Sequence, residues 1–425
     1  MHTDFLIAGT GCAGLFCALH LPENKKVTVI TKADAESNDS FLAQGGICVE
    51  RDANDFDSFF EDTLKAGHYE NNPESVKVMI TESRKVIEKL IGFGVKFNKN
   101  ADGTLAYTRE GAHSKPRILF HRDITGKEIT SKLLAEAKKR KNIEILEYTT
   151  LLDIIEKNNR CVGAVIQTSE KKLVPVWCDA VLLATGGIGG LFRHSTNFKH
   201  LTGDALAIAA KHGVELKDID YIQIHPTTLY SDSAEERSFL ISESVRGEGA
   251  KLYNKNFERF TDELQPRDLL TNAIYKKMEE ENTEHVWEDL RPIPKEEIQN
   301  HFPNIAAHCK DKGYDVTEEC IPVVPAQHYF MGGVKIDLNG KTSMEGLFAA
   351  GETACNGVHG KNRLASNSLL ESLVFAGRAA SEMAKSQKFT HPFEVDLSCY
   401  ENTATLAEQY KNTVLNLIEK EKEHV

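Results

Sequence analysis

Residues 4–14 read Asp-Phe-Leu-Ile-Ala-Gly-Thr-Gly-Cys-Ala-Gly, a short apolar run that ends in the pattern Gly-x-Gly-x-x-Gly. An apolar helix pattern follows as far as residue 21, and a second apolar run covers residues 27–31. This order predicts a strand, a tight turn, a helix and a second strand, which together form a βαβ unit. The glycines let the backbone approach a pyrophosphate, which then rests on the helix N-terminus. In this context the pattern predicts a dinucleotide-binding fold.

Lys32 stands at the end of the second predicted strand, where nicotinamide-binding proteins usually carry an Asp or Glu for the ribose. The lack of an acid at this position argues against NAD and favours FAD. We therefore expect an α/β protein built on a doubly wound FAD-binding domain.

The composition excludes several other classes of protein. The 425 residues carry 51 Lys and Arg against 63 Asp and Glu, a formal charge of −12, which argues against binding to nucleic acid or to an anionic membrane. No window approaches the roughly 20 apolar residues of a membrane span, and the N-terminus does not resemble a signal peptide. The nine cysteines form no Cys-x-x-Cys pair, so neither a disulfide framework nor a metal site is expected. Scattered thiols of this kind are typical of a cytoplasmic protein.

The rest of the chain suggests two domains and a tail. A helix is expected over residues 123–140, strands over residues 151–156, 161–168, 173–178, 180–185 and 346–350, and a hairpin turn at Asn158-Asn159. Residues 220–329 hold most of the prolines, more charge and no clean strand alternation, and we interpret them as an inserted capping domain. The FAD-binding domain then comprises residues 1–219 and 330–389. Residues 390–425 form a helical tail, with Leu406, Tyr410, Val414 and Ile418 at helical spacing.

Three further motifs are ambiguous when each is considered alone. Residues 43–46 (Ala-Gln-Gly-Gly) and 184–187 (Ala-Thr-Gly-Gly) could each contact a cofactor through exposed amides or form a simple turn. Glu352 follows a predicted strand and a glycine, where its carboxylate suits a polyol chain, but an acid in a loop is also commonly solvated.

Several cationic or histidine side chains lie beside Gly, Pro or small residues, away from obvious helix faces: His225, Arg246, Arg267, His328 and Arg363. Arginine offers a bidentate fork for carboxylates, and histidine can donate or titrate near neutral pH. Each could instead belong to a structural ion pair. Their occurrence together around a glycine-rich framework suggests a site for a small dianion.

The motifs occur together in a recognisable order. They are residues 43–46, Thr-Arg-Glu-Gly at 108–111, Gln-Ile-His-Pro-Thr at 223–227, Arg-Gly-Glu-Gly at 246–249, Pro-Arg-Asp at 266–268 and the run from His359 to Glu371. Over nearly its whole length the chain thus resembles the flavoprotein superfamily of succinate dehydrogenase, fumarate reductase and L-aspartate oxidase.

Two positions divide this superfamily. Succinate dehydrogenases and membrane fumarate reductases attach FAD to a histidine five residues before the Gln of Ala-Gln-Gly-Gly, and that position is Asp39 here. The resemblance therefore implies non-covalent FAD. The run Thr-Arg-Glu-Gly-x-His-Ser at 108–114 resembles the signature of the L-aspartate oxidases. Glu110 could meet the ammonium group of an amino acid, which succinate lacks. It could instead brace a neighbouring cation such as Arg109.

The resemblance also implies roles for individual residues. FAD would be held by Thr10, Gly11, Cys12, Ala13, Lys32, Asp39, Ser40, Phe41, Leu42, Ala43, Gln44, Gly45, Gly46, Asp204, Glu352, Ser368 and Leu369. The substrate carboxylates would be met by His225, Ser242, His328 and Arg363, where Ser242 replaces the threonine of the family. Arg267 matches the arginine that transfers a proton when the family reduces fumarate, although an arginine with a pKa above about 12 is a poor base.

The implied reaction is oxidation of L-aspartate to iminoaspartate, with loss of a hydride from Cα to FAD and reoxidation by O2 or fumarate. Iminoaspartate would feed quinolinate synthase in de novo NAD biosynthesis. The chain has about one helix where the family usually has a C-terminal bundle of roughly a hundred residues, which bears on stability and flavin retention rather than on chemistry. Two alternatives remain: a soluble fumarate reductase-like flavoprotein, and a non-catalytic flavin-binding protein.

Overall fold

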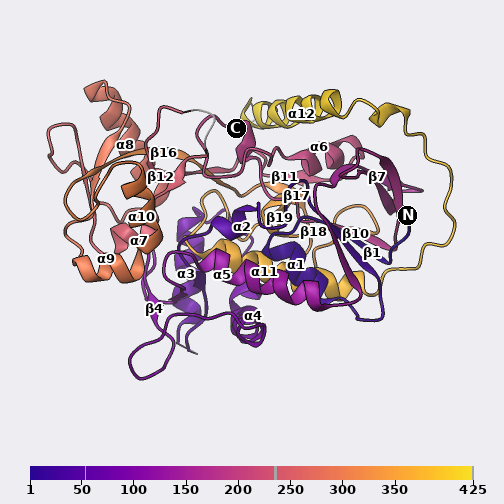
Figure 1. Cartoon of the computed structure of the whole chain (residues 1–425), viewed down its shortest axis with the longest axis horizontal. Helices are drawn as coiled ribbons and strands as arrows, with labels where there is room; N and C mark the ends of the chain where they lie inside the picture. Colours follow the sequence, from indigo (N-terminus) through magenta and orange to yellow (C-terminus); the bar gives the residue numbers. More distant parts are fainter. Residues whose placement is uncertain (53, 234–236, 424–425) are drawn as a thin grey trace.

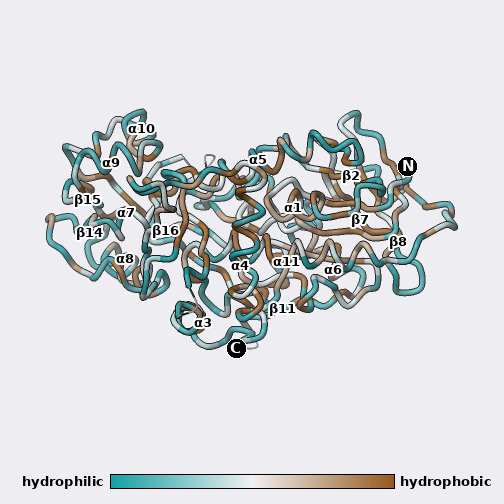
Figure 2. The backbone as a smooth tube through the Cα atoms, turned by 90° about the horizontal axis from the view of Figure 1, so that it is seen from below, coloured by the Kyte–Doolittle hydropathy of each residue, from teal (hydrophilic) through white to brown (hydrophobic). Residues whose placement is uncertain are grey.

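The computed structural model describes residues 1–52, 54–233 and 237–423. These residues form two hydrophobic cores. The larger core draws its buried side chains from residues 5–219 and 330–418, and the smaller core from residues 229–323. In Figure 1 the segments of the smaller core lie at the left end of the molecule, and the N-terminus lies at the opposite end. Figure 2 shows segments of hydrophobic residues in the interior and mostly hydrophilic residues in the outer loops.

Five parallel strands form the central sheet, in the order β18-β10-β1-β2-β6. Their bounds are β1 (Phe5–Ala8), β2 (Val27–Ile30), β6 (Ile143–Leu146), β10 (Ala180–Leu183) and β18 (Leu347–Ala349). All residues of β1, β2, β10 and β18 are buried, as is usual for a parallel sheet. The strand order changes direction at β1, which has β2 on one side and β10 on the other. Ligands bind at such switch points, beyond the carboxyl ends of the strands.

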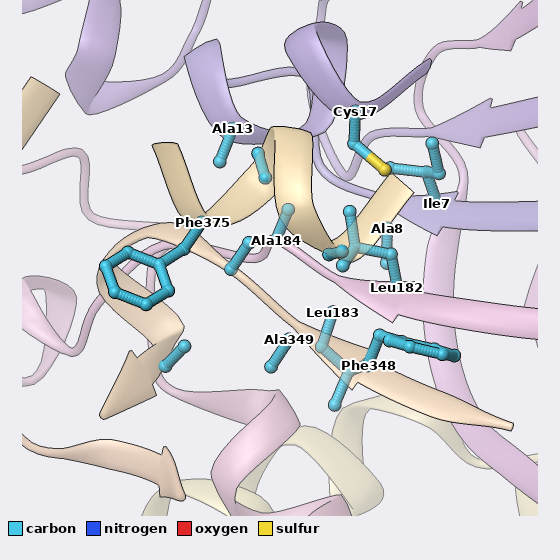
Figure 3. Packing of buried hydrophobic residues seen from close by; sticks show 14 of the residues in the cluster. Ile7, Ala8, Ala13, Cys17, Leu182, Leu183, Ala184, Phe348, Ala349 and Phe375 are labelled. Atoms are coloured by element: carbon cyan, nitrogen blue, oxygen red, sulfur yellow. The ribbon is translucent and has the colours of Figure 1, made fainter. Parts of the chain in front are cut away.

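Helices α1 (Cys12–His20), α5 (Thr125–Lys139) and α11 (Asn367–Met383) pack together beside this sheet. Figure 3 shows Cys17 of α1 and Phe375 of α11 in the same hydrophobic cluster as strand residues such as Leu182. The antiparallel sheet of β7 (Thr150–Glu156), β8 (Cys161–Gln167) and β9 (Leu173–Trp177) packs through β8 on β10. Asn158 and Asn159 have φ of +55° and +58°, which makes the predicted hairpin turn. The predicted α/β fold is confirmed.

The smaller core surrounds an antiparallel sheet in the order β13-β12-β16-β15-β14. Its elements are β12 (Ile222–Leu229), β13 (Phe239–Leu240), α7 (Glu243–Gly247), β14 (Lys251–Tyr253), α8 (Arg267–Glu281), β15 (Val286–Asp289), α9 (Lys295–His301), α10 (Pro303–Asp311) and β16 (Ile321–Phe330). No strand alternation was expected here. The alternation is absent because β16 is buried along most of its length and β12 is interrupted by register shifts at 223/224 and 225–228. The domain boundary expected at residues 329/330 falls inside β16.

The remaining elements complete the fold. They are α2 (Asp39–Leu42), β3 (Ile47–Cys48), α3 (Phe56–Ala66), α4 (Pro73–Gly92), β4 (Tyr107–Thr108), β5 (Ile118–Leu119), α6 (Asp204–Lys211), β11 (Leu216–Lys217), β17 (Gly333–Lys335), β19 (Ala354–Cys355), α12 (Thr403–Glu423) and 3-10 turns at Gly189–Leu191, Gly351–Thr353 and Ser398–Tyr400. Helix α12, yellow in Figure 1, packs on α6 and buries Leu406, Tyr410, Val414 and Ile418, as predicted. None of the helices in the described ranges is long and apolar enough to cross a bilayer.

Candidate active site

A large cavity opens at the carboxyl ends of β1, β2, β10 and β18. It measures about 1690 Å³, including its solvent-open mouth. Its wall also includes His225, Ser242, Arg267 and His328, so segments of both hydrophobic cores line it. The cavity thus extends from the glycine turn after β1 to segments of the smaller core, a span that suits a dinucleotide with a small substrate beyond it.

The turn between β1 and α1 approaches β10 so closely that it needs glycine. Gly9 has a φ of +121°, and a Cβ atom there would lie 2.0 Å from the carbonyl oxygen of Ala184. A Cβ atom at Gly14 would lie 2.0 Å from the carbonyl oxygen of Gly9. Helix α1 therefore begins at the cavity wall, where its first amide groups can bind an anion.

Lys32 and Asp204 meet where β2 and α6 reach the cavity. Nζ of Lys32 donates to Oδ2 of Asp204 at 2.5 Å and to the carbonyl oxygen of His200 at 3.0 Å. The hydroxyl of Thr202 donates to Oδ1 of Asp204 at 2.6 Å. The structure thus brings together two predicted cofactor residues that are 172 positions apart.

Asp39 is the first residue of α2 and is half-buried at the cavity wall, with its Oδ2 atom enclosed. Burial raises the pKa of Asp39 to about 7, although the Phe198 amide, which donates to Oδ1 at 3.1 Å, and the charge of Arg237 oppose this shift. Oδ2 of Asp39 has no hydrogen-bond partner among the described residues. A buried polar atom without a partner calls for a ligand or a water at that position.

Glu110 lies beside Gly45, and its carboxylate is held by two neutral hydroxyls. Oε1 accepts from Oγ of Ser244 and Oε2 accepts from Oγ of Ser366, both at 2.6 Å. Burial and the nearby Glu243 raise the pKa of Glu110, whereas the two hydroxyls lower it. A Cβ atom at residue 45 would lie 2.6 Å from Oε1 of Glu110, so the glycine leaves room for the carboxylate. Arg109 is exposed and does not brace Glu110.

Two arginines of the cavity wall share one hydrogen-bond acceptor. Nη1 of Arg267 and Nε of Arg363 donate to Oε1 of Gln223, at 2.8 Å and 3.3 Å. Nε of Arg267 also donates to Oε2 of Glu243 at 2.6 Å. Burial of Glu243 would raise its pKa, but the charges of Arg267 and Arg246 lower the pKa overall, so Glu243 is an anion.

The guanidinium of Arg363 is fixed by two further contacts. Nη1 donates to Oγ of Ser368 at 2.6 Å, and the guanidinium lies 4.5 Å from the centre of the Tyr329 ring. Burial and then the charge of Arg267 lower the pKa of Arg363 to about 10, which leaves it protonated at neutral pH. Stacking and hydrogen bonding together fix the plane of the fork, as bidentate binding of a carboxylate requires.

His225 and His328 are neighbours on β12 and β16, with ring centres 5.1 Å apart. His225 lies at the register shift of β12, and such bulges often re-aim a side chain near an active site. Burial and the charge of Arg267 lower the pKa of both histidines well below the usual value, so both are neutral near pH 7. Nε2 of His225 is buried without a partner in the described part of the chain, and Nδ1 of His328 lies 2.8 Å from the hydroxyl of Thr196.

The buried polar atoms that lack a hydrogen-bond partner indicate whether the cavity suits FAD. Four cavity-lining residues each carry one buried polar atom without a partner among the described residues: Thr10, Asp39, Gln44 and His225. They lie along the cavity between the glycine turn and the two histidines. A ligand with polar groups along its whole length would satisfy them, and the residues therefore fit FAD with a substrate beyond it.

All but one of the predicted cofactor and substrate residues line the cavity. Phe41 is the exception, because neighbouring residues on a helix point in different directions. Ser40 and Leu42 line the cavity, whereas the ring of Phe41 lies 5.7 Å from Nζ of Lys127. The ring of Phe41 therefore lies outside the cavity, and its predicted role in holding the cofactor stays a prediction.

Arg246 and Arg267 were expected away from helix faces, but Arg246 lies within α7 and Arg267 begins α8. Ser242 caps the first of these helices through its side chain. Arg246 does not line the cavity. It donates to Thr227 and, at 3.2 Å, to the carbonyl oxygen of Glu263, and therefore supports the wall from behind.

Several cavity residues were not identified from the sequence, among them Arg237, Glu243, Tyr329 and Ser366. Glu243 follows a capping serine, where an acid is common for helix stability alone. Arg237 belongs to no motif that the sequence displays.

Comparison with known proteins agrees with this geometry. A family model described as FAD binding domain matches residues 4–369. The L-aspartate oxidase of Clostridium perfringens is 53% identical over 380 residues, which cover 89% of this chain and 86% of the relative. The chain belongs to the L-aspartate oxidase family. The resemblance inferred from the motifs is confirmed, and FAD is the cofactor of the family fold.

Other members of the family differ in how much of their length is matched. The Clostridium acetobutylicum L-aspartate oxidase is 50% identical over 389 residues, 92% of this chain and 89% of the relative. The chloroplastic L-aspartate oxidase 2-b of Nicotiana tabacum is 40% identical over 394 residues, but the match covers only 61% of that relative. The length outside the shared region therefore varies within the family.

Solved structures show the same fold. The chain superposes on the E. coli quinol fumarate reductase FrdA with a TM-score of 0.85 and 30% identity, covering 96% of this chain and 74% of that one. A quinol-fumarate reductase with menaquinol gives a TM-score of 0.87 at 29% identity, covering 97% and 76%.

Proposed function

We propose that this protein oxidises L-aspartate to iminoaspartate with FAD, as the first step of de novo NAD biosynthesis, and that O2 or fumarate reoxidises the cofactor. The observation that carries this proposal is the position of Glu110. Its buried carboxylate lines the same cavity as Arg267 and Arg363 and is bonded to hydroxyls rather than to a cation. A substrate with one ammonium and two carboxylate groups matches that charge pattern.

The arginine, histidine and serine side chains of the cavity wall bind the two carboxylates of the substrate. Arg363 receives one carboxylate on its fixed fork, and His225, His328 and Ser242 donate to the other. Because both histidines are neutral near pH 7, the arginines supply the charge in this part of the cavity. Clamping the substrate at both ends fixes the orientation of its Cα–H bond. This orientation lowers the activation barrier of the oxidation, because the reacting groups are already held in place.

Glu110 binds the substrate ammonium. Burial disfavours the ionised carboxylate in the empty cavity, and an entering ammonium compensates its charge. When bound, FAD supplies the two-electron acceptor for the Cα–H bond. Thr10 to Ala13, Lys32, Asp39 to Gly46, Asp204, Glu352, Ser368 and Leu369 would hold it, with Phe41 contributing only through its backbone.

Arg267 is held rigidly by Glu243 and Gln223, and we assign it to proton transfer when fumarate is reduced. Residues 220–329 act as a cap whose closure over the cavity excludes water. The product passes to quinolinate synthase, and the protein works in the cytoplasm.

A soluble fumarate reductase is the second candidate, because the dicarboxylate donors His225, His328 and Arg363 are all present in the cavity. Fumarate has no ammonium, however, and gains nothing from a carboxylate at residue 110. A flavin-binding protein without catalytic activity would not need Arg267 and Arg363 to be held in place by Gln223.

Purified protein loaded with FAD is tested for hydrogen peroxide with L-aspartate, D-aspartate and succinate, and anaerobically for L-aspartate oxidation with fumarate as the acceptor. We expect turnover of L-aspartate but not of D-aspartate or succinate, and we expect it with either O2 or fumarate as the electron acceptor. Turnover of succinate without L-aspartate would support the reductase instead, and no turnover of any substrate would leave a flavin-binding role.

A further inference from the structure

Arg117 is the largest side chain in the described ranges with no solvent exposure, at 0%, and it lies outside the cavity. Its guanidinium contacts two carboxylates of the α3 region. Nη2 donates to Oδ1 of Asp55 at 3.0 Å, and Nη1 donates to Oδ2 of Asp62 at 2.6 Å. The ring of Phe59 lies 5.0 Å from it. A buried cation with this many partners has a fixed position and can fix its neighbours.

One of those neighbours is His113. Nη1 of Arg117 lies 3.0 Å from Nδ1 of His113, and Nε2 of His113 lies 3.0 Å from the carbonyl oxygen of Ala365. Arginine can only donate and a carbonyl oxygen can only accept, so Nδ1 is the acceptor and Nε2 carries the proton. Burial, together with the charge of Arg117, lowers the pKa of His113 to about 4, so the ring is neutral. Arg117 thus selects the tautomer in which His113 bonds Ala365.

This bond connects two segments of the active site. His113 is three residues after Glu110, and Ala365 directly precedes Ser366. Oγ of Ser366 donates to Glu110 at 2.6 Å and accepts from the amide of Gly46 at 3.2 Å. Ala112 and Ser366 both have left-handed φ values, of +61° and +60°. Residues other than glycine rarely adopt this backbone conformation, and it persists only where surrounding contacts hold it.

We propose that Arg117 and His113 are positioning residues for substrate selection, which hold the loop of residues 108–114 against Ala365 so that the Glu110 carboxylate faces the substrate ammonium. They touch neither substrate nor FAD. The proposal rests on the proposed function, because it assigns these residues to discrimination between L-aspartate and a dicarboxylate without an ammonium. Loosening the loop should weaken L-aspartate binding and leave the dicarboxylate clamp of His225, His328 and Arg363 intact.

The decisive variants change His113. His113→Leu removes the donor to Ala365, whereas His113→Gln places an amide N–H near the position of Nε2 and should restore the bond. We expect His113→Leu to raise the KM for L-aspartate by at least roughly tenfold. The KM for fumarate and the inhibition constant of succinate should stay within about threefold of wild type. His113→Gln should recover most of the loss. Arg117→Lys should resemble His113→Leu, because an ammonium cannot reproduce the fork.

Two further measurements separate positioning from general stability. Lys115→Ala changes an exposed side chain just after this loop, which donates a hydrogen bond to the carbonyl oxygen of Asn54, and should leave all constants unchanged. Hydrogen exchange of peptides covering residues 108–114, measured without substrate, should accelerate in His113→Leu and not in His113→Gln.

Equal losses for L-aspartate and fumarate, or no recovery in His113→Gln, would overturn the proposal. Arg117→Lys can fail to fold because it disturbs the ion pairs with the buried Asp55 and the half-buried Asp62, and the two His113 variants then decide. Wild-type protein in the same assay keeps the proposals separate: no L-aspartate oxidation by wild type refutes the function, whereas wild-type activity with unchanged His113 variants refutes only the positioning role.

Discussion

Ser366 donates a 2.6 Å hydrogen bond to Glu110, although 256 residues separate the two along the chain. The bond satisfies a buried carboxylate oxygen without neutralising its charge. A carboxylate paired with an arginine would have no net charge to offer a ligand, whereas one bonded to hydroxyls remains able to bind an ammonium. The relationship therefore accounts for selection of an amino acid over a plain dicarboxylate.

Glu110→Gln should separate the two activities of the site. The amide keeps the size of the side chain and removes the charge that attracts the L-aspartate ammonium. We expect kcat/KM for L-aspartate to fall by at least roughly tenfold, about 1.4 kcal/mol, with fumarate reduction unchanged or improved. Both half-reactions are measured on one FAD-loaded preparation. Parallel losses would remove Glu110 as the discriminating residue.

Arg363→Lys should severely reduce turnover. A lysine ammonium cannot reproduce a bidentate fork that is stacked on Tyr329 and bonded to Ser368. Loss of one charged hydrogen bond in a dry site costs roughly 2–4 kcal/mol, or about 30- to 1000-fold in kcat/KM. The control is Arg378→Lys on α11, the helix that begins four residues after Arg363; the Arg378 side chain bonds Leu338, Asn339 and Glu82 instead. A change below about threefold would mean that Arg363 does not contact the substrate.

FAD should be released when the protein is denatured by acid or heat, because Asp39 occupies the position of the covalent histidine and cannot form that link. After centrifugation the yellow colour should be in the supernatant, with the absorbance of free FAD. Colour that stays in the pellet, or flavin fluorescence on the protein band of a denaturing gel, would contradict non-covalent binding.

Glu352 should make the FAD-free protein less stable as the pH rises. Burial, together with the charge of the nearby Asp39, raises the pKa of Glu352 from the ordinary value of 4.5 to about 8. Between these two values the folded protein holds a proton that the unfolded chain has lost, so the contribution of Glu352 to stability falls with rising pH. Glutamine cannot ionise. The Tm of Glu352→Gln relative to wild type should therefore increase from pH 5 to pH 8 and level off above pH 8.

Glu382→Gln is the matched control for this pH series. Lys341 and Lys385 lower the pKa of Glu382 to about 2, so that residue is ionised in the folded and unfolded chain throughout the same range. Its difference in Tm from wild type should be constant from pH 5 to pH 9. A constant difference for Glu352→Gln as well would show that Glu352 is ionised in the folded protein.

Val414→Ala should weaken FAD binding from a distance. Val414 of α12 is fully buried, and a Cβ atom at Gly203 would lie 3.3 Å from its Cγ2, so it supports the turn that places Asp204. Removing two methyl groups should cost about 1–3 kcal/mol and lower the Tm and the affinity for FAD. Leu415→Ala, at a neighbouring position that is 41% exposed, should change neither measurably. Equal effects of the two variants would indicate only general loss of the helix.

The sequence by itself determined the local structure around the cofactor. The glycines at 9, 11 and 14 occur between two apolar runs, and only a tight turn from a strand into a helix satisfies that order. The spacing of Leu406, Tyr410, Val414 and Ile418 similarly determined which face of the last helix is buried, because the period of a helix depends on neighbours along the chain.

Only the tertiary structure decided which polar groups meet. Glu110 could have braced Arg109, and no local pattern excludes that pairing. Its actual partners, Ser244 and Ser366, come from segments 134 and 256 residues away. Arg246 looked as suitable for a ligand as Arg363 did, yet one lies behind the wall and the other on it. Periodicity reports burial along one element, whereas hydrogen-bond partners depend on how the elements pack, and the packing of two separate cores over one cavity is not encoded in any short stretch.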